Sequence, residues 1–342
     1  MKKIEREGCR AMQDRYGRKI EYMRVSVTDR CNLRCIYCMP PEGVQSIAHS
    51  QILTFDEIER ICRIGAGLGI SKIKLTGGEP LTRKNLPELL GMIKRLKGIE
   101  QVTLTTNGIF LKDNIDELVS CGMDGVNISI DTLNEEKYCE LTRGGRLSSA
   151  LEGLEAALAF PELHVKVNCV PMDRTDESDW IGLAELARDG RAEVRFIEMM
   201  PVGLGKQFRG RSSDEVLGVL ERAFGRAEDY SGQLGNGPAS YVQFPGFRAR
   251  IGFISAVSHQ FCDSCNRIRL TSTGVLKPCL QYGGGTDIRG LMRSGAEDAQ
   301  IKTAMRRAIY RKPAHHHFAD GEAMTEEEKQ SLEKSEMSRI GG

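Results

Sequence analysis

The sequence predicts an α/β protein in which a long strand-and-helix region is followed by a smaller module. From residue 21 to about 200, short β-rich runs alternate with amphipathic helical stretches, the pattern of parallel strands joined by crossover helices. Beyond about residue 210 this alternation of strand and helix patterns ends, and a glycine-rich linker lies at 231–237. The 342 residues suffice for one large or two modest domains with a real core.

Six strands are predicted in the first region. The helix after the first strand begins at Thr54, which can cap it, because Glu57 stands three residues later as in a capping box. Six β/α units fit a partial or complete barrel or an open doubly wound sheet, and in each case the active groups gather at the C-terminal ends of the strands. The predicted strands cover 21–28, 71–76, 101–106, 125–130, 164–170 and 193–199.

The C-terminal module is expected to contain two hairpins and then helices. Alternating aromatic and polar residues predict a hairpin over 241–255, and a second hairpin turns at 271–274. Helices follow near 286–310, and the polar, charged end predicts by composition a frayed tail. The expected organisation is an N-terminal extension (1–20), a barrel-type domain (21–210), a C-terminal module (211–324) and a tail (325–342).

Composition excludes several classes of protein. Lys plus Arg number 48 against 47 Asp plus Glu, so a net charge of +1 favours neither nucleic acid nor an acidic membrane as a partner. The chain is 40% hydrophobic and 28% charged, without an apolar run long enough to span a membrane. The charged N-terminus lacks the apolar stretch of a secretory signal, so a cytoplasmic location is expected. In a reducing compartment, clustered cysteines indicate metal binding or catalysis rather than disulfides.

The first cysteine cluster, Cys31, Cys35 and Cys38, has the spacing C-x3-C-x2-C directly after the first strand. Three soft thiolates on one loop suit an iron–sulfur cluster whose fourth iron remains open to another ligand. The alternative is a zinc site completed by a distant residue such as His49. Three bunched cysteines fit that alternative poorly, because zinc sites usually pair C-x2-C arms.

The second cluster, Cys262, Cys265 and Cys279, also holds three cysteines. Its spacing is compatible with part of a zinc ribbon and equally with an iron–sulfur cluster, and His259 is the nearby candidate for a fourth ligand. The other five cysteines are scattered through predicted helices and strands and are interpreted as small hydrophobic residues. These are Cys9, Cys62, Cys121, Cys139 and Cys169.

These motifs resemble known families. C-x3-C-x2-C with Tyr37 before its last cysteine is similar to the radical S-adenosylmethionine (SAM) superfamily, and the stretch 77–80 resembles that superfamily's GGEP motif. The second triad, the NRIR stretch at 266–269 and the final Gly-Gly resemble the GTP 3′,8-cyclase family, which performs the first step of molybdenum cofactor biosynthesis. The likeness runs from about residue 24 to residue 342.

The resemblance implies an incomplete (β/α)6 TIM-type barrel closed by a C-terminal module that carries a second iron–sulfur cluster. It implies two [4Fe-4S] clusters, one held by Cys31, Cys35 and Cys38 and one by Cys262, Cys265 and Cys279. Positions that match SAM contacts are Tyr37, Gly78, Glu79, Ser129 and Met200. Positions that match GTP contacts are Arg24, Lys74, Thr105, Lys166, Arg195, Arg267, Ile268 and Arg269. The matching catalytic tail comprises Arg339, Gly341 and Gly342.

The implied reaction begins with one-electron cleavage of SAM to methionine and a 5′-deoxyadenosyl radical. Hydrogen abstraction from the ribose C3′ of GTP and attack on guanine C8 then give (8S)-3′,8-cyclo-7,8-dihydroguanosine 5′-triphosphate. The expected partners are GTP, a reductant such as a flavodoxin or ferredoxin, and cyclic pyranopterin monophosphate synthase, which takes the product; a homodimer is a further expectation. Rival interpretations are a peptide-modifying two-cluster radical SAM maturase and a zinc or iron–sulfur binding module without catalysis.

Two features depart from the family or from common patterns. The family commonly has arginine at the position of Lys74, so a bidentate phosphate contact would become a single-point one. The stretch 143–146 also differs from the usual sequence.

The histidines at 315–317 could suggest a metal tract, but after Lys312 and Pro313 they are interpreted as a surface loop.

Overall fold

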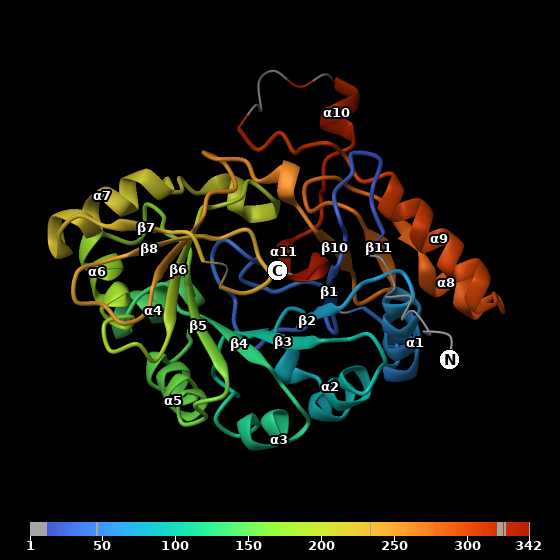
Figure 1. Cartoon of the computed structure of the whole chain (residues 1–342), viewed down its shortest axis with the longest axis horizontal. Coiled ribbons are helices and arrows are strands. Elements are labelled where there is room, and N and C mark those ends of the chain that lie inside the picture. The colour runs from blue at the N-terminus through green and yellow to red at the C-terminus, as the bar shows by residue number, and fades with distance from the viewer. Residues whose placement is uncertain (1–11, 46, 233, 320–323, 325, 342) are drawn as a thin grey trace, which may run out of the picture.

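The computed structural model describes residues 12–341 except 46, 233, 320–323 and 325. One twelve-stranded sheet runs in the order β12-β11-β10-β1-β2-β3-β4-β5-β6-β9-β8-β7, and the six strands β1 to β6 pair in parallel with their neighbours. The sheet curls into a partial barrel with helices around its outside (Figure 1). The α/β prediction is confirmed, and its barrel alternative is the one adopted.

All six predicted strands are present, with ends displaced by at most two residues. They are β1 (Tyr22–Ser26), β2 (Lys72–Thr76), β3 (Gln101–Thr106), β4 (Gly125–Ser129), β5 (His164–Cys169) and β6 (Glu193–Ile197). The helices between and after them are α1 (Phe55–Ala66), α2 (Leu86–Lys94), α3 (Ile115–Ser120), α4 (Glu135–Thr142), α5 (Leu147–Leu158), α6 (Glu177–Glu185) and α7 (Ser213–Phe224). The predicted capping box of α1 forms between Thr54 and Glu57.

The strands alternate between an apolar outer face and a polar inner face. On β1, Met23 and Val25 are fully buried in the main hydrophobic core, while Arg24 between them points to the other side of the sheet. On β2, Ile73 and Leu75 flank Lys74 in the same way. Apolar side chains pack under the outer helices, so the fold leaves charged side chains inside the barrel.

The C-terminal region extends the same sheet at both edges. Strands β7 (Glu228–Tyr230), β8 (Ser240–Gln243) and β9 (Ile251–Ile254) follow β6, and β10 (Arg267–Leu270), β11 (Val275–Lys277) and β12 (Thr286–Asp287) lie beyond β1. The antiparallel pairs β8–β9 and β10–β11 confirm both predicted hairpins. At the second turn Gly274 adopts a φ of 83°, a left-handed conformation that glycine tolerates best. The predicted helices also appear, as α8 (Ile288–Arg293) and α9 (Asp298–Tyr310).

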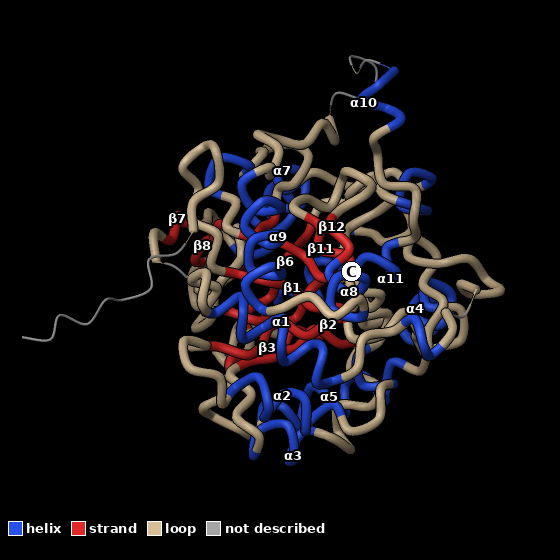
Figure 2. The backbone as a smooth tube through the Cα atoms, turned by 90° about the vertical axis from the view of Figure 1, so that its right-hand side faces the viewer, coloured by secondary structure: helices blue, strands red, loops and turns tan. Residues whose placement is uncertain are grey.

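The prediction of a frayed tail is wrong for the described residues beyond 325. Helix α10 (Glu326–Gln330) projects from the body, whereas α11 (Met337–Ile340) lies against it (Figure 2). Ile340 is 3% exposed, and α11 lies near the middle of the barrel (Figure 1). Composition misled here because the contacts that order the tail come from segments far away in sequence. Thr325 and Gly342 lie outside the described residues.

None of the described helices has the length and apolar character needed to cross a membrane.

Candidate active site

The first cysteine triad lies on the loop after β1. Cys31, Cys35 and Cys38 are partly exposed, and none forms a disulfide. The amides of Cys38 and Met39 both donate to the Cys35 carbonyl, at 2.9 and 3.1 Å, and this tight turn brings the thiols near one another. Each of the Cys31 and Cys38 thiols raises the pKa of Cys35 through its charge, which is a sign of that proximity.

The environment of this triad disfavours free thiolates. Burial raises the pKa of Cys31 to about 11 and that of Cys38 to about 12, and it raises the pKa of Cys35 well above its ordinary value. A metal group takes cysteines as thiolates, so binding it would supply the positive charge that the loop lacks. The acidic groups that add to the rise are Glu79, Asp131 and Glu336.

The glycines after β2 allow this loop to pack directly on the next strand end. A Cβ on Gly77 would lie 2.7 Å from the Thr28 carbonyl oxygen, and one on Gly78 would lie 2.4 Å from that of Arg30. The Gly78 amide donates to the Thr28 carbonyl at 2.8 Å. The motif therefore holds the cysteine loop by close backbone contact, which no side chain at these positions would permit.

Glu79 follows these glycines and is 1% exposed. Its carboxylate accepts hydrogen bonds from the Asn107 amide at 2.7 Å and the Thr106 hydroxyl at 2.8 Å, both at the end of β3. The Leu81 amide adds a third at 3.0 Å. Burial raises the pKa of Glu79 to about 7 despite these donors. A buried carboxylate near the cysteine loop is suited to a cationic ligand group.

Tyr37 is linked through Asp131 to the segment that follows β4. The Tyr37 hydroxyl donates to Asp131 at 2.7 Å, and the Val170 amide donates to the other oxygen of that carboxylate at 2.8 Å. Burial raises the pKa of Asp131 to about 6. Ser129 is the last residue of β4. The matched SAM positions in this part of the chain thus lie at strand ends around the first triad, as expected for a barrel enzyme.

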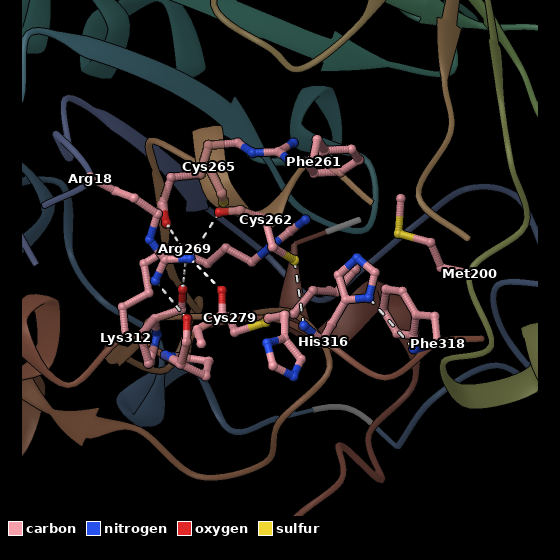
Figure 3. A pocket seen from close by; sticks show the side chains of 16 residues that line it. Arg18, Met200, Phe261, Cys262, Cys265, Arg269, Cys279, Lys312, His316 and Phe318 are labelled. Atoms are coloured by element: carbon pink, nitrogen blue, oxygen red, sulfur yellow. Dashed lines mark hydrogen bonds between the residues drawn. The ribbon is translucent and has the colours of Figure 1, made fainter. Parts of the chain in front are cut away.

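The second triad lines one pocket (Figure 3). Cys262 and Cys265 lie just before β10, and the β10–β11 hairpin returns the chain so that Cys279 lines the same pocket. Arg267 and Arg269, on one face of β10, line it too. In the described ranges, no three Cys, His, Asp or Glu side chains converge on the position of a single metal ion.

Two cations that sequence reasoning missed frame this pocket. Arg18 donates to the carbonyl oxygens of Cys262 at 2.8 Å and Ala314 at 2.7 Å. Lys312, 3% exposed, donates to those of Arg267 at 2.9 Å and Pro278 at 2.5 Å.

The cations change the acidity of the second triad. Burial would raise the pKa of the Cys265 thiol, yet Lys312 and Arg267 outweigh it and lower that pKa to about 6. For Cys262, burial dominates and raises the pKa. At least one thiol of this triad is therefore held as a thiolate near neutral pH.

The surface-loop interpretation of 315–317 is wrong for His316, which is 5% exposed and lines the pocket of the second triad. Its amide donates to the Cys262 sulfur at 3.4 Å, and burial lowers the pKa of its ring to about 4. His315 is exposed, as predicted. His259, the candidate fourth ligand, instead lies at the surface beside Asp214 at 3.1 Å.

Five cations converge inside the barrel. Arg24 on β1 stands in register with Lys74 on β2 and with Arg269 on β10. Lys166 on β5 and Arg195 on β6 are each 7% exposed and lie close enough to Lys74 to lower its pKa through their charge, after burial, which is the main cause. Arg24, Lys166 and Arg195 thus lie on β1, β5 and β6, with their side chains inside the barrel.

Two of these cations have a partner inside the barrel. Lys166 pairs with Glu193 at 2.6 Å, and Arg195 donates to the Asn168 side-chain oxygen at 2.9 and 2.6 Å. Burial, Arg24 and Arg267 lower the pKa of Arg269 to about 9. Clustered positive charge is costly to bury, and a bound anion offsets that cost, so the interior is suited to a polyanionic ligand.

The remaining matched positions differ in what they can offer. Thr105 on β3 has a buried hydroxyl oxygen without a hydrogen-bond partner in the structure, so it can bind a ligand. The Ile268 side chain is 1% exposed and packs in the main core on the opposite face from Arg267 and Arg269, which leaves only its backbone for a ligand. Met200 lines the pocket of the second triad.

The tail completes this interior. The Gly341 carbonyl accepts hydrogen bonds from Arg24 at 3.4 Å, Arg269 at 3.0 Å and the Thr76 hydroxyl at 3.4 Å. Gly341 has a φ of 80°, and a Cβ there would lie 3.0 Å from the Thr76 hydroxyl oxygen. Arg339 turns away from this group and donates to the Gln45 carbonyl at 2.9 Å.

Comparisons with known proteins agree with the fold and the motifs. Residues 25–187 match the Radical SAM superfamily. The Streptococcus suis protein SuiB, crystallised with its precursor peptide SuiA, superposes with a TM-score of 0.57 at 16% identity over 86% of this chain and 65% of SuiB. The partial barrel and the cysteine loop define a radical SAM protein.

The relatives identify the family more narrowly. Residues 192–318 match the family Molybdenum Cofactor Synthesis C. The GTP 3′,8-cyclase of Clostridium perfringens strain 13 is 41% identical over 90% of this chain and 95% of its own length. That of Pelotomaculum thermopropionicum is 41% identical over 97% of this chain and 100% of its own length. The chain belongs to the GTP 3′,8-cyclase family and shares that family's use of SAM and an iron–sulfur cluster.

The residues present fit these groups. The first triad offers three neighbouring sulfurs at the mouth of a parallel barrel, and the acidic, buried Glu79 is suited to the amino group of SAM. The second triad offers three more sulfurs around one pocket, beside the cation cluster. The unpartnered Thr105 oxygen and the excess of buried cations suit a triphosphate.

Proposed function

We propose that this GTP 3′,8-cyclase converts GTP to (8S)-3′,8-cyclo-7,8-dihydroguanosine 5′-triphosphate between two [4Fe-4S] clusters, one on each cysteine triad. When bound, the first cluster and SAM supply the radical chemistry. The chain's own part is to hold both ligands in line and to exclude water. In this proposal SAM is held by all of the positions matched to it, which are Tyr37, Gly78, Glu79, Ser129 and Met200.

The observation that carries the proposal is the group of barrel cations, of which Arg269 lines the pocket of the second triad. A ligand of about four negative charges can enter a buried cavity only where fixed cations compensate it. Arg24 and Lys74 stand in register with Arg269, so three strands present cations at one level of the barrel. In this proposal the GTP-binding set is Arg24, Lys74, Thr105, Lys166, Arg195, Arg267, Ile268 through its backbone, and Arg269.

The arginines of β10 provide the test. The double variant Arg267→Ala/Arg269→Ala should weaken GTP binding, since each lost charged hydrogen bond costs on the order of 1.5–3 kcal/mol, while reductive cleavage of SAM continues. Arg306→Ala/Arg307→Ala on the exposed face of α9 is the matched control. GTP affinity and 5′-deoxyadenosine should be measured together under anaerobic conditions. An unchanged GTP affinity in the β10 variant would contradict the assignment.

The tail is proposed to assist catalysis through Gly341 and Gly342, whereas Arg339, which the family resemblance also matched, donates to the Gln45 carbonyl instead. The contacts of the Gly341 carbonyl with Arg24 and Arg269 support this role. Deletion of the two glycines should leave folding, iron content and most GTP binding intact but abolish the cyclised product. Near-normal product from the truncated chain would remove the tail from the mechanism, and loss of iron would make it structural.

Further parts of the proposal concern organisation and partners. Residues 21–210 act as the SAM domain and 211–324 as the module for the second cluster and substrate, with 1–20 as an extension and 325–342 as the tail. A flavodoxin or ferredoxin delivers electrons in the cytoplasm, cyclic pyranopterin monophosphate synthase receives the product, and the enzyme is a homodimer. Anaerobic light scattering and reduction assays with each donor test the assembly and the electron donor.

A further inference from the structure

A buried ion pair joins the tail to the turn that carries Cys279. The side chains of Lys277 at the end of β11 and Glu333 in the tail are 3% and 8% exposed, and the Lys277 ammonium donates to the Glu333 carboxylate. The same ammonium donates to the carbonyl oxygens of Tyr282 at 2.7 Å and Gly284 at 3.2 Å. Lys277 therefore closes the turn over 277–284 and holds the tail with one group.

Glu333 in turn shapes the tail. Its second carboxylate oxygen accepts the amides of Lys334 at 3.0 Å and Ser335 at 2.8 Å, and its own amide donates to the Gln281 carbonyl at 2.6 Å. These bonds fix the bend from which α11 starts. The carboxylate thus sets the direction and the register of the last residues of the chain.

The residues beyond this bend contact the loop after β6, the turn that carries Cys279 and the barrel cations. Glu336 accepts the Leu204 amide at 3.3 Å, and Ile340 packs in a small cluster with Val202 and Leu280, the residue after Cys279. Gly341 then reaches the barrel cations. A shift of one residue at Glu333 would move the Gly341 carbonyl away from Arg24 and Arg269.

We propose that Lys277 and Glu333 are positioning residues, which dock the tail on the Cys279 turn so that Gly341 reaches the barrel cations. The part of this inference that concerns catalysis rests on the proposed role of the tail. A buried ion pair costs desolvation that an apolar pair of similar size would avoid, so its best-attested use is to select one register among several. This pair adds a buried charged link to the backbone contact between Glu333 and Gln281 that also joins the tail to the Cys279 turn.

The experiment compares Glu333→Gln with Glu326→Gln in the cluster-loaded, full-length enzyme. Glu326 pairs with Lys329 in the same tail, but their side chains are 81% and 43% exposed, so this pair is the matched control. Hydrogen exchange of peptides covering 331–341 and tryptic cleavage after Lys334 report docking directly. In Glu333→Gln we expect exchange in these peptides and cleavage after Lys334 to rise about tenfold or more and product formation to fall. Iron content and GTP affinity should match the wild type.

A second variant separates docking from folding. Lys277→Met/Glu333→Met removes both charges without leaving either one unpaired, so the fold should survive and the tail register should still be lost. Unchanged tail exchange in both variants would overturn the proposal, and so would loss of iron together with tail protection, which would make the pair structural. If deletion of Gly341 and Gly342 leaves product formation normal, the catalytic role of the tail fails, while the exchange data still decide whether this pair docks it.

Discussion

The two cysteine triads have the same number of thiols in opposite electrostatic surroundings. Around the first, the charged neighbours include Glu79, Asp131 and Glu336, and all three thiol pKa values are raised. Around the second, Lys312 and Arg267 lower the pKa of Cys265 to about 6. Burial raises the pKa of Cys262 as well, so the contrast lies in the charged neighbours, which are mainly acidic at the first triad and basic beside Cys265.

This difference matches two different tasks. Hydrogen bonds and positive charge near the sulfurs raise the reduction potential of an iron–sulfur cluster, and their scarcity lowers it. The acidic surroundings of the first triad thus suit a strong reductant. The basic surroundings of the second suit a site that holds an anionic substrate. An equal number of cysteines therefore says little about what each set does.

The largest expected effect comes from removing either triad. Cys31, Cys35 and Cys38 replaced together by alanine should lose about half of the iron and all cleavage of SAM. The same replacement of Cys262, Cys265 and Cys279 should lose the other half but retain SAM cleavage, because the two sites use separate ligands. Iron, sulfide and 5′-deoxyadenosine are measured on anaerobically reconstituted protein. SAM cleavage that survives in the first variant, or stoichiometric zinc in either variant, would contradict the assignment of one iron–sulfur cluster to each triad.

A smaller effect is expected from the cation that distinguishes the second site. Lys312→Met leaves the carbonyls of Arg267 and Pro278 without their donor, which should destabilise the protein by about 1–3 kcal/mol. It should also shift the potential of the proposed cluster on the second triad to more negative values and leave that of the proposed cluster on the first triad unchanged. Lys302→Met on the exposed side of α9 is the control. Redox titration followed by EPR checks both sites, and equal shifts at both would contradict the assignment.

The buried Glu79 beside the first triad predicts that SAM binding depends on pH. Burial raises the pKa of Glu79 to about 7, so this carboxyl is mostly neutral at pH 6 and mostly ionised at pH 8. A cationic ligand group binds the ionised form, so SAM affinity should rise with pH above 6 and fall again once the amino group of SAM loses its proton, at a pKa of about 7.7–8.0. Calorimetry on wild type, Glu79→Gln and the exposed Glu88→Gln checks this. The SAM affinity of Glu79→Gln should be low and independent of pH, whereas that of Glu88→Gln should follow the wild type.

The sequence predicted the parts of the molecule that depend on local patterns. The six parallel strands are marked by apolar residues on one face, and the α1 capping box by Thr54 and Glu57, so these elements were found within two residues. Cysteine spacing likewise located both triads. The charged residues in mid-strand, such as Lys74 between Ile73 and Leu75, were a usable sign of a polar barrel interior.

The parts that sequence reasoning missed depend on distant contacts. Arg18 lies in a stretch considered an extension, yet it binds the Cys262 carbonyl across 244 positions of sequence. His316 looked like one of three surface histidines, and only the packing of its loop against the second triad buries it. A polar tail looked frayed because the partner of Glu333 stands 56 residues earlier. A single polar residue that is buried in a loop leaves no periodic pattern in the sequence, so its burial cannot be predicted from that pattern.

The smallest expected effect concerns a cysteine outside both triads. Cys139 is exposed on α4, which packs close to the first cysteine loop: the Arg34 and Ile36 amides of that loop donate to the Thr142 and Leu141 carbonyls at the end of the helix. Because an exposed side chain contributes little to packing, Cys139→Ser should leave iron content, SAM cleavage and stability unchanged to within about 0.5 kcal/mol. Iron analysis and thermal unfolding beside the first-triad variant give the measurement. A loss of iron in Cys139→Ser would mean that this thiol takes part in cluster assembly, and the contrast between the two sites would then involve more than six cysteines.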